Sequence, residues 1–248
     1  MSKNQAANEG IRKDISNRLL AQLKQRFASE VLWHFVGRGK SDHESYQILL
    51  SILRTGLKVG EKNEFKFVDP ATNEIQTLWG YPVCCLADIP LKDLHIHAER
   101  YGRFAIGFHK ESAISSNFNP VLYINQYSSV FHHFILRRNE VEGYLERTNS
   151  DIAGKFQELL LLLGSVTKSG DLKANPVAAL MLDEMQLNNF YYEREWRSIY
   201  NWDFQKDDVA ILIMPDETLD DFRKDRKRGD LRIDEDTPIL PFSMVYRL

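Results

Sequence analysis

The stretch from residue 31 to residue 56 constrains the fold more than any other part of the chain. It begins with an apolar run, Val31–Val36, whose β-branched and aromatic residues predict a buried strand. A Gly-Arg-Gly turn ends this run, and Ser41 and Glu44 then have the spacing of a capping box at the start of a helix. Apolar residues repeat at helical intervals up to Gly56, which fits a C-cap. The sequence therefore predicts a strand, a tight polar loop and a helix.

His34 is the one polar residue within this apolar run. A strand that presents a histidine beside a glycine-containing loop, with a helix packed behind it, would hold the imidazole rigidly in a cleft. The simpler interpretation is a buried histidine that donates a hydrogen bond to a backbone carbonyl. This stretch alone leaves both interpretations open.

The composition fits one soluble globular domain. The 248 residues, of which 43% are hydrophobic and 27% charged, can bury a substantial core. The adjacent Cys84 and Cys85 suit neither a disulfide framework nor a C-x-x-C metal pair, and they fit small hydrophobic residues in a reducing cytoplasm. Because no apolar run reaches the length of a membrane span and the N-terminus lacks the apolar core of a signal peptide, we expect a cytoplasmic protein. The net charge of -3 gives no global attraction to nucleic acid, so such a contact would need a local patch.

The order of the apolar periods predicts an α+β domain that spans residues 1–248. Residues 1–30 read as an amphipathic helix, residues 31–125 as the first half of a sheet core, residues 126–188 as a helical insertion and residues 189–248 as the second half of the core. Strand-rich ends around a helical middle favour this class over an alternating parallel-sheet fold. The apolar residues of the first helix recur every fourth position, at Ile11, Ile15, Leu19, Leu23 and Phe27.

Several segments carry more specific expectations. The turn signals in Glu61–Thr77 predict a hairpin or a mobile loop, and the leucine run Leu159–Leu163 predicts a buried helix. We expect strands at Tyr101–Phe108 and Ile239–Tyr246, and a charged surface helix within Asp216–Arg228.

A second polar interruption of a strand-like run occurs late in the chain. With a period of two, Glu193, Glu195 and Arg197 share one face, whereas Arg194 and Trp196 take the other. Two carboxylates beside an arginine suit a site that stabilises positive charge on a substrate or accepts a hydroxyl proton. The alternative is an exposed strand face with cross-strand ion pairs.

Other candidates are single residues or pairs. Tyr101 follows a polar helix, where it would form either an aromatic stacking surface at the edge of a cleft or part of the core. The pairs His95 and His97, and His132 and His133, come without a recognisable third and fourth ligand, so we predict no metal site.

Six short motifs follow one another along the chain. They are Trp33-His-Phe-Val36, Ile52-Leu-Arg-Thr-Gly-Leu57, Cys85-Leu-Ala-Asp-Ile-Pro90, Tyr101-Gly-Arg-Phe-Ala-Ile-Gly-Phe-His-Lys110, Asn119-Pro-Val-Leu-Tyr-Ile124 and Glu193-Arg-Glu-Trp-Arg197. Taken in this order, they resemble the AbiGi-type abortive phage-infection proteins over most of residues 31 to 200. This family is often described as an antitoxin, and the layout is also similar to the ADP-ribosyltransferase fold. Sites of that fold take a polar residue from the first strand, an aromatic residue from a middle strand and a glutamate from a late strand.

The resemblance implies catalytic roles for His34, Tyr101 and Glu195. His34 would hold the adenosine-side ribose of NAD, and Tyr101 would stack on nicotinamide. Glu195 would bond the nicotinamide ribose and orient the acceptor while the glycosidic bond breaks through an oxocarbenium-like state, with Glu193 as the competing candidate.

Further residues complete the NAD site that the resemblance implies. Phe35 and Gly37 join His34, Tyr101 and Glu193 in the set expected to bind NAD. For the aromatic position the sequence also leaves two substitutes open, Tyr81 and Tyr123.

The leading hypothesis is a phage-defence ADP-ribosyltransferase that uses NAD as co-substrate and has a cognate toxin or antitoxin partner. Its acceptor would be a macromolecule, with RNA or DNA favoured over protein because Arg38, Lys40 and Arg197 could flank one cleft. The rival is a non-catalytic antitoxin or infection sensor that works by binding, and a third hypothesis is a metal-dependent nuclease. The enzyme hypothesis requires His34 and Glu195 to face each other across a shared pocket.

Overall fold

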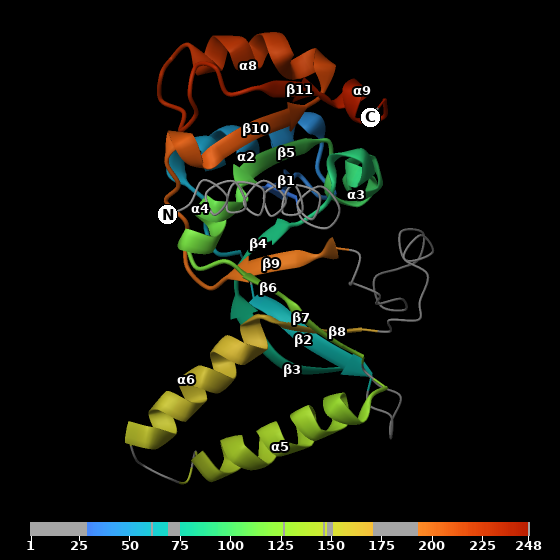
Figure 1. Ribbon diagram of the computed structural model, residues 1–248, viewed down its shortest axis with the longest axis vertical. Helices are drawn as coiled ribbons and strands as arrows, with labels where there is room; N and C mark the ends of the chain where they lie inside the picture. The colour runs from blue at the N-terminus through green and yellow to red at the C-terminus, as the bar shows by residue number, and fades with distance from the viewer. Residues whose placement is uncertain are drawn as a thin grey trace, which may run out of the picture. The chain divides into compact units, whose positions relative to one another are not determined.

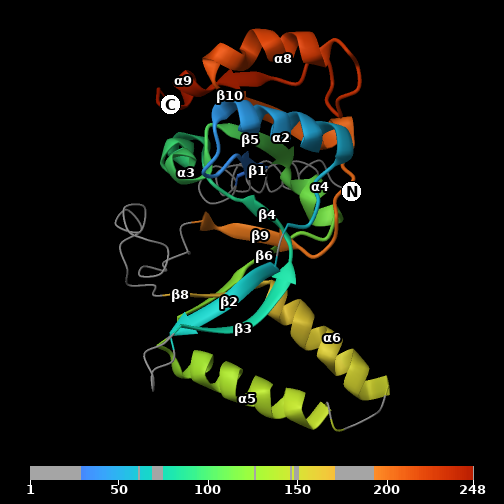
Figure 2. The same cartoon turned by 180° about the vertical axis from the view of Figure 1, so that it is seen from behind.

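The computed structural model describes residues 29–60, 62–68, 75–125, 127–145, 147, 151–170 and 193–247 (Figures 1 and 2). By its internal contacts the chain divides into two units, residues 1–30 and residues 31–248, and the described helices and strands belong to the second unit. Two expectations fall largely on residues outside the described ranges. These are the helix over residues 1–30 and the last part of the helical insertion, residues 171–188.

A mixed sheet of seven strands forms the centre of the described residues, in the order β11-β10-β5-β1-β4-β9-β6. Neighbouring strands run antiparallel except for β10 and β11, which are parallel. With its helices, this sheet confirms the α+β class. The strands are β1 (Val31–Val36), β4 (Cys84–Ala87), β5 (Phe104–His109), β6 (Asn119–Pro120), β9 (Glu195–Ser198), β10 (Val209–Met214) and β11 (Ile239–Pro241).

The helices belong either to the central sheet or to the insertion. The sheet is accompanied by α2 (Asp42–Thr55), α3 (Leu94–Tyr101), α4 (Lys110–Ser115), α8 (Leu219–Arg226) and α9 (Phe242–Val245), and by the short 3-10 turns η1 (Leu91–Asp93), η3 (Lys206–Asp208) and η4 (Asp216–Thr218). The insertion contributes α5 (Ser129–Leu145) and α6 (Asp151–Ser165).

The predicted strand, loop and helix at the start of the sheet are confirmed. At the start of α2 the Ser41 side chain accepts a hydrogen bond from the Glu44 backbone N–H, and the Glu44 carboxylate accepts one from the Ser41 N–H. Gly37, between β1 and α2, has φ +97, and a Cβ there would lie 1.9 Å from Ser45 Oγ. Only glycine combines this backbone angle with so close an approach.

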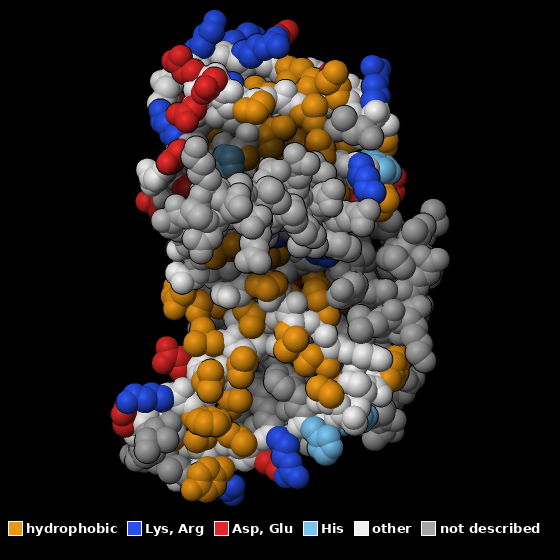
Figure 3. Space-filling view, in the orientation of Figure 1, with side chains coloured by type: hydrophobic (Ala, Val, Ile, Leu, Met, Phe, Trp, Pro, Cys, Tyr) orange, Lys and Arg blue, Asp and Glu red, His pale blue; other side chains and the backbone are white. Residues whose placement is uncertain are grey.

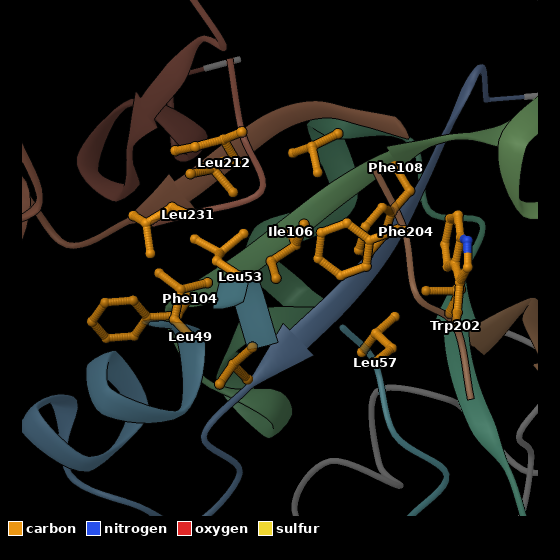
Figure 4. Packing of buried hydrophobic residues seen from close by; sticks show 14 of the residues in the cluster. Leu49, Leu53, Leu57, Phe104, Ile106, Phe108, Trp202, Phe204, Leu212 and Leu231 are labelled. Carbon is orange, nitrogen blue, oxygen red and sulfur yellow. The ribbon is translucent and has the colours of Figure 1, made fainter. Parts of the chain in front are cut away.

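The two faces of the sheet pack against different helices. On one face, Leu49 and Leu53 of α2 pack against Phe104 and Ile106 of β5 within the large core cluster (Figure 4). Phe222 brings α8 into the same cluster. On the other face a smaller cluster combines residues of the sheet with α3 and α9, namely Trp33, Ala87, Ile89, Leu94, Ala98, Ala105, Ile213, Phe242 and Val245.

Beyond β6 lie two further pairs of strands. β2 (Lys62–Val68) and β3 (Ile75–Pro82) form an antiparallel hairpin, which confirms the hairpin interpretation of this stretch. β7 (Leu122–Asn125) and β8 (Thr167–Gly170) run parallel, and the insertion helices α5 and α6 connect them. The helix α6 packs against β3 and α5.

Three local predictions need correction. Tyr101 is the last residue of α3 and not the first of a strand, because Gly102 with φ +100 ends the helix and β5 begins at Phe104. Residues Ile239–Tyr246 are not one strand, since Pro241 offers no N–H for further pairing and α9 follows it. In the leucine run of α6, Leu159, Leu162 and Leu163 are exposed, because the buried side of this helix carries Ala153 and Gly164 instead. The predicted charged helix is confirmed as α8.

Candidate functional site

The predicted alternation in β9 is confirmed by strand pairing. Glu195 pairs with Ala87 and Arg197 pairs with Cys85, so their side chains lie on the face that α3 and α9 cover. Glu193 lies two residues before the start of the strand, with Arg194 between them. All three charged side chains are buried, with exposed fractions of 4% for Glu193, 8% for Glu195 and 2% for Arg197.

Two cations neutralise the two carboxylates, the buried Arg197 and the partly buried Lys168. Arg197 holds Glu195 through two hydrogen bonds, Nε to Oε1 at 2.9 Å and Nη2 to Oε2 at 3.0 Å. Lys168, from β8, donates to Glu193 Oε2 at 2.6 Å and to Glu195 Oε2 at 3.1 Å. Burial raises the pKa of Glu195, but the charges of Lys168 and Arg197 outweigh this effect and hold that pKa well below its ordinary value. Glu195 is therefore a fixed anion, and we call these four residues the β9 charge network.

Tyr101 joins this face from the end of α3. Its hydroxyl donates to Glu193 Oε1 at 2.5 Å. The ring is stacked on His97 with centroids 4.5 Å apart, and the Arg38 guanidinium lies 5.5 Å from the ring centroid. Phe35 contacts both His97 and Tyr101. His97, Phe35 and Arg38 therefore surround the Tyr101 ring. A nicotinamide could stack on this ring only on a face that these three side chains do not cover.

Tyr123 and Tyr81 are the two alternatives to Tyr101 as the residue that stacks on nicotinamide. Tyr123, on β7, accepts a hydrogen bond from the Glu195 backbone N–H at 2.7 Å. Burial raises the pKa of this tyrosine, so its hydroxyl stays protonated. Tyr123 thus supports the backbone of β9. The side chain of Tyr81 lies outside the described part of the structure.

His34 lies on the opposite face of the sheet. Its neighbour Trp33 pairs with Ala87, and Ala87 pairs with Glu195, so Trp33 and Glu195 share a face. Because side chains alternate along a strand, His34 points to the other side, toward the large core cluster. The prediction that His34 and Glu195 face each other is therefore wrong.

The contacts of His34 match the simpler interpretation of this residue. Nδ1 lies 3.0 Å from the Cys85 carbonyl oxygen, which can only accept, so Nδ1 carries the proton and donates it. Burial lowers the pKa of His34, which keeps the ring neutral. Gly37, the other predicted NAD-binding residue of this stretch, serves the close approach of the β1–α2 loop to Ser45.

The histidine pairs do not form a recognisable metal centre. Among the described residues, no group of three or more histidine, cysteine, aspartate or glutamate side chains could hold a metal ion. His95 and His97 lie in α3, where His97 stacks on Tyr101. His132 and His133 are exposed on α5.

Sequence reasoning missed Lys168 and a second polar group on the face of His34. In that group, Lys110 donates to Asp88 Oδ2 at 2.8 Å and Arg194 does so at 3.3 Å, while Lys110 also lies over the Trp196 ring. Arg194 adopts φ +43, an uncommon angle for a non-glycine residue. No periodic signal marks Lys168 or Lys110, because each is a single charge at an element boundary.

Comparisons with known proteins agree on one family. The family model described as "Putative abortive phage resistance protein AbiGi, antitoxin" matches residues 58–232. A curated relative from Lactococcus lactis subsp. cremoris, "Abortive phage resistance protein AbiGi", is 28% identical over 145 residues. That match covers 54% of this chain and 56% of the relative, so the chain spans about half the length of the curated relative.

Two further findings concern the fold and the length of the helices. No solved structure matches the chain, and its likeness to ADP-ribosyltransferases stays a prediction. Within the described residues, no helix has the length and apolar character that a bilayer span requires. Since the family model matches well over half of the sequence, this chain belongs to the AbiGi family of abortive phage resistance proteins.

Proposed function

We propose that this chain is the antitoxin of a phage-defence system and acts by binding a cognate toxin, not by transferring ADP-ribose. The observation that carries the proposal is the state of the β9 charge network, in which Lys168 and the buried Arg197 already bind the two candidate catalytic carboxylates. The antitoxin description of the family supports the same role.

The network leaves Glu195 poorly suited to catalysis. A glutamate that bonds a ribose and orients an acceptor must accept hydrogen bonds from those groups in the reacting complex. Here Arg197 occupies both carboxylate oxygens and Lys168 bonds one of them as well. Separating a buried ion pair leaves an uncompensated charge, at a cost of about 3 to 5 kcal/mol. Substrate binding would have to supply that energy.

The same contacts have a clear structural use. Arg197 Nη1 donates to the carbonyl oxygens of Ser165 at 3.0 Å and Thr167 at 3.4 Å. Lys168 extends from β8 to the two glutamates of the β9 segment. The network therefore attaches the end of α6 and the start of β8 to the central sheet. An attached insertion can present a fixed surface to a protein partner.

The antitoxin proposal is tested by neutralisation of the cognate toxin in cells. We expect co-expression of the wild-type chain to restore growth that the toxin arrests. Glu195→Gln should reduce this protection only as far as it reduces the thermal stability of the purified chain. Failure of the wild-type chain to relieve the toxin would overturn the proposal, as would a stable Glu195→Gln variant that has lost all protection.

ADP-ribosyl transfer at a site that does not include His34 is the second candidate, because one observation favours it. Tyr101, Phe35 and Glu193, all predicted to bind NAD, lie on the same face as Glu195, and Tyr101 bonds Glu193 directly. The acceptor would be a macromolecule, with RNA or DNA favoured because Arg38 lies beside Tyr101.

The test for this second candidate uses labelled NAD with RNA, DNA and protein acceptors. Label transfer by the wild-type chain, lost in both Glu195→Gln and Tyr101→Ala while the fold is retained, would establish transfer. If the wild-type chain neither releases nicotinamide nor labels an acceptor, the candidate is excluded.

A further inference from the structure

Asp88, directly after β4, is a buried carboxylate of which only one oxygen has partners. Its side chain is 6% exposed, and Oδ2 accepts hydrogen bonds from Lys110 Nζ at 2.8 Å and from Arg194 Nη2 at 3.3 Å. Oδ1 is buried too, yet no group within the described part of the chain donates a hydrogen bond to it. Because buried polar atoms almost always have a partner, this oxygen indicates a donor from outside the chain.

The three residues come from three parts of the central sheet. Asp88 follows β4, Lys110 begins α4, and Arg194 comes directly before β9. Since Ala87 pairs with Glu195 and side chains alternate along a strand, Asp88 lies on the opposite face of the sheet from the β9 charge network. We call Asp88, Lys110 and Arg194 the Asp88 group. It is separate from the carboxylates that were considered for catalysis.

Arg194 holds its position against the preference of its backbone. Its φ of +43 lies in the left-handed region, where a residue with a Cβ is strained and glycine is not. The Asp88 backbone N–H donates to the Arg194 carbonyl oxygen at 3.0 Å, which keeps the two residues side by side. The Arg194 side chain is 39% exposed, so solvent reaches the Asp88 group from this side. Backbone strain at a partly exposed cation favours a use for its guanidinium.

Lys110 is fixed from two directions. Its ammonium bonds Asp88 and also lies 4.9 Å from the centroid of the Trp196 ring. Two cations held in place would attract an anion, but the Asp88 carboxylate that they share would repel it. An anion that carries a proton resolves this conflict. Its hydroxyl can donate to Asp88 Oδ1 while its other oxygens accept hydrogen bonds from Lys110 and Arg194.

We propose that the Asp88 group binds a phosphate group that carries one proton, either inorganic phosphate or the phosphate of a small monoester. The second pKa of a phosphate monoester is about 6, so a protonated oxygen is available in mild acid and near neutral pH. Sulfate has the same tetrahedral shape but carries no proton at this pH, and neither does the phosphodiester of a nucleic acid. Asp88 would therefore reject both. The inference does not depend on the proposed antitoxin role.

Attraction of anions to surface cations would give a different result. Figure 3 shows lysine and arginine side chains gathered over α8. Three of them, Arg223, Lys224 and Arg228, are exposed and form ion pairs with aspartates three residues earlier in the chain. Since water surrounds an anion at such exposed pairs, phosphate and sulfate should bind there alike. The α8 cations thus provide the control for the Asp88 group.

The first test is isothermal titration calorimetry on the purified full chain at about pH 6 and constant ionic strength. The probes are inorganic phosphate and phenyl phosphate, and the controls are sulfate and dimethyl phosphate. We expect at least one probe to bind about tenfold or more tightly than either control, since one hydrogen bond to a charged group accounts for that factor. The probe that binds more tightly tells whether the natural ligand is free or esterified phosphate.

The second test uses Arg194→Gly, which removes a phosphate donor and the backbone strain together. We expect this variant to unfold at the same temperature as the wild type or a higher one, but to bind phosphate about tenfold more weakly. An arginine with only a structural role would lower the unfolding temperature when removed. The matched control is Arg228→Gly, which removes an exposed arginine paired with Asp225 and should leave phosphate binding unchanged.

Asp88→Asn tests the selectivity directly. The amide replaces an acceptor by a donor and removes the negative charge, so sulfate should bind this variant as tightly as phosphate does. Circular dichroism checks that the variant is folded.

Three results would overturn the proposal. If the wild-type chain binds neither phosphate probe, an internal water is the donor to Asp88 Oδ1. Equal affinities of the wild type for phosphate and sulfate would show attraction to surface cations only. Phosphate binding that Arg194→Gly leaves unchanged would place the anion site elsewhere.

Discussion

Among the single residues of this chain, two histidines, His34 and His97, are uncharged at neutral pH, whereas Glu195 keeps its charge. Burial lowers the pKa of His34, and it lowers that of His97 to about 4, so both rings are neutral in the folded protein at neutral pH. Glu195 is equally buried, yet Lys168 and Arg197 keep it charged. The difference follows from the partners, because a carbonyl or an aromatic ring cannot compensate an imidazolium as two cations compensate a carboxylate.

The neutral histidines predict a loss of stability in mild acid. An unfolded histidine binds a proton below about pH 6.5, whereas folded His97 resists protonation down to about pH 4. The unfolded state therefore binds more protons, and the free energy of unfolding falls as the pH is lowered through this window. For His97 alone the loss between pH 6.5 and 4.5 is about 2 to 3 kcal/mol.

Urea denaturation at a series of pH values measures this loss. His97→Phe keeps a ring beside Tyr101 but cannot titrate, so its stability should vary less with pH than that of the wild type. His132→Phe, at an exposed position, serves as the control. Equal slopes for the wild type and His97→Phe would contradict the prediction.

Tyr101 gives a second prediction for a single residue. Its hydroxyl donates to the Glu193 carboxylate, and hydrogen bonds to charged groups contribute about 1.5 to 3 kcal/mol. Tyr101→Phe should lower the free energy of unfolding by that amount. Tyr200→Phe changes an exposed tyrosine and should have little effect. A Tyr101→Phe variant as stable as the wild type would mean that the contact with Glu193 contributes nothing in solution.

For the individual helices and strands, the sequence predicts those features that neighbouring residues determine. The capping box and the glycine-rich turn predict the β1–α2 unit because each acts within a few residues. Which face His34 takes relative to Glu195 depends on the pairing of β1 with β4 and of β4 with β9, and no local pattern contains that information. The sequence could not predict that leucines of α6 are exposed either. A leucine run predicts burial, but it does not show which element would cover the helix.

The loop between β1 and α2 offers a matched pair of glycines. Gly37 and Gly39 have φ +97 and +68, but a Cβ at Gly37 would meet Ser45 Oγ at 1.9 Å, whereas nothing lies within 4 Å of one at Gly39. Gly39→Ala should cost about 1 to 2 kcal/mol, the strain of a left-handed residue. Gly37→Ala should cost clearly more, because Ser45 must also move. Thermal unfolding of both variants checks this, and equal losses would show that the loop rearranges freely.

In the whole molecule, the β9 charge network joins segments that are far apart in the sequence. Lys168 is 25 residues from Glu193 and 27 from Glu195, and Arg197 reaches back to the end of α6. The sequence predicted the two glutamates and the arginine as a group because they alternate on one strand. It could not predict Lys168, since a lone lysine after an apolar helix has no spacing that relates it to β9.

A double-mutant cycle on Lys168 and Glu195 measures how strongly the network attaches β8 to the sheet. Lys168→Met leaves the buried glutamates short of a cation and should lower the free energy of unfolding by about 3 to 5 kcal/mol. Adding Glu195→Gln to that variant should cost much less than Glu195→Gln costs alone, with a coupling of about 1 to 3 kcal/mol.

The exposed ion pair between Arg137 and Glu140 on α5 provides the control cycle, in which coupling should be close to zero. Hydrogen exchange locates the effect, because the end of α6 depends on Arg197 and the start of β8 carries Lys168. Lys168→Met should therefore increase the exchange rate more at the end of α6 and the start of β8 than in β1 or β5. If exchange instead rises uniformly across the sheet, or if the cycle shows no coupling, the network does not hold the insertion in place, and the charges of β9 must be explained by a ligand.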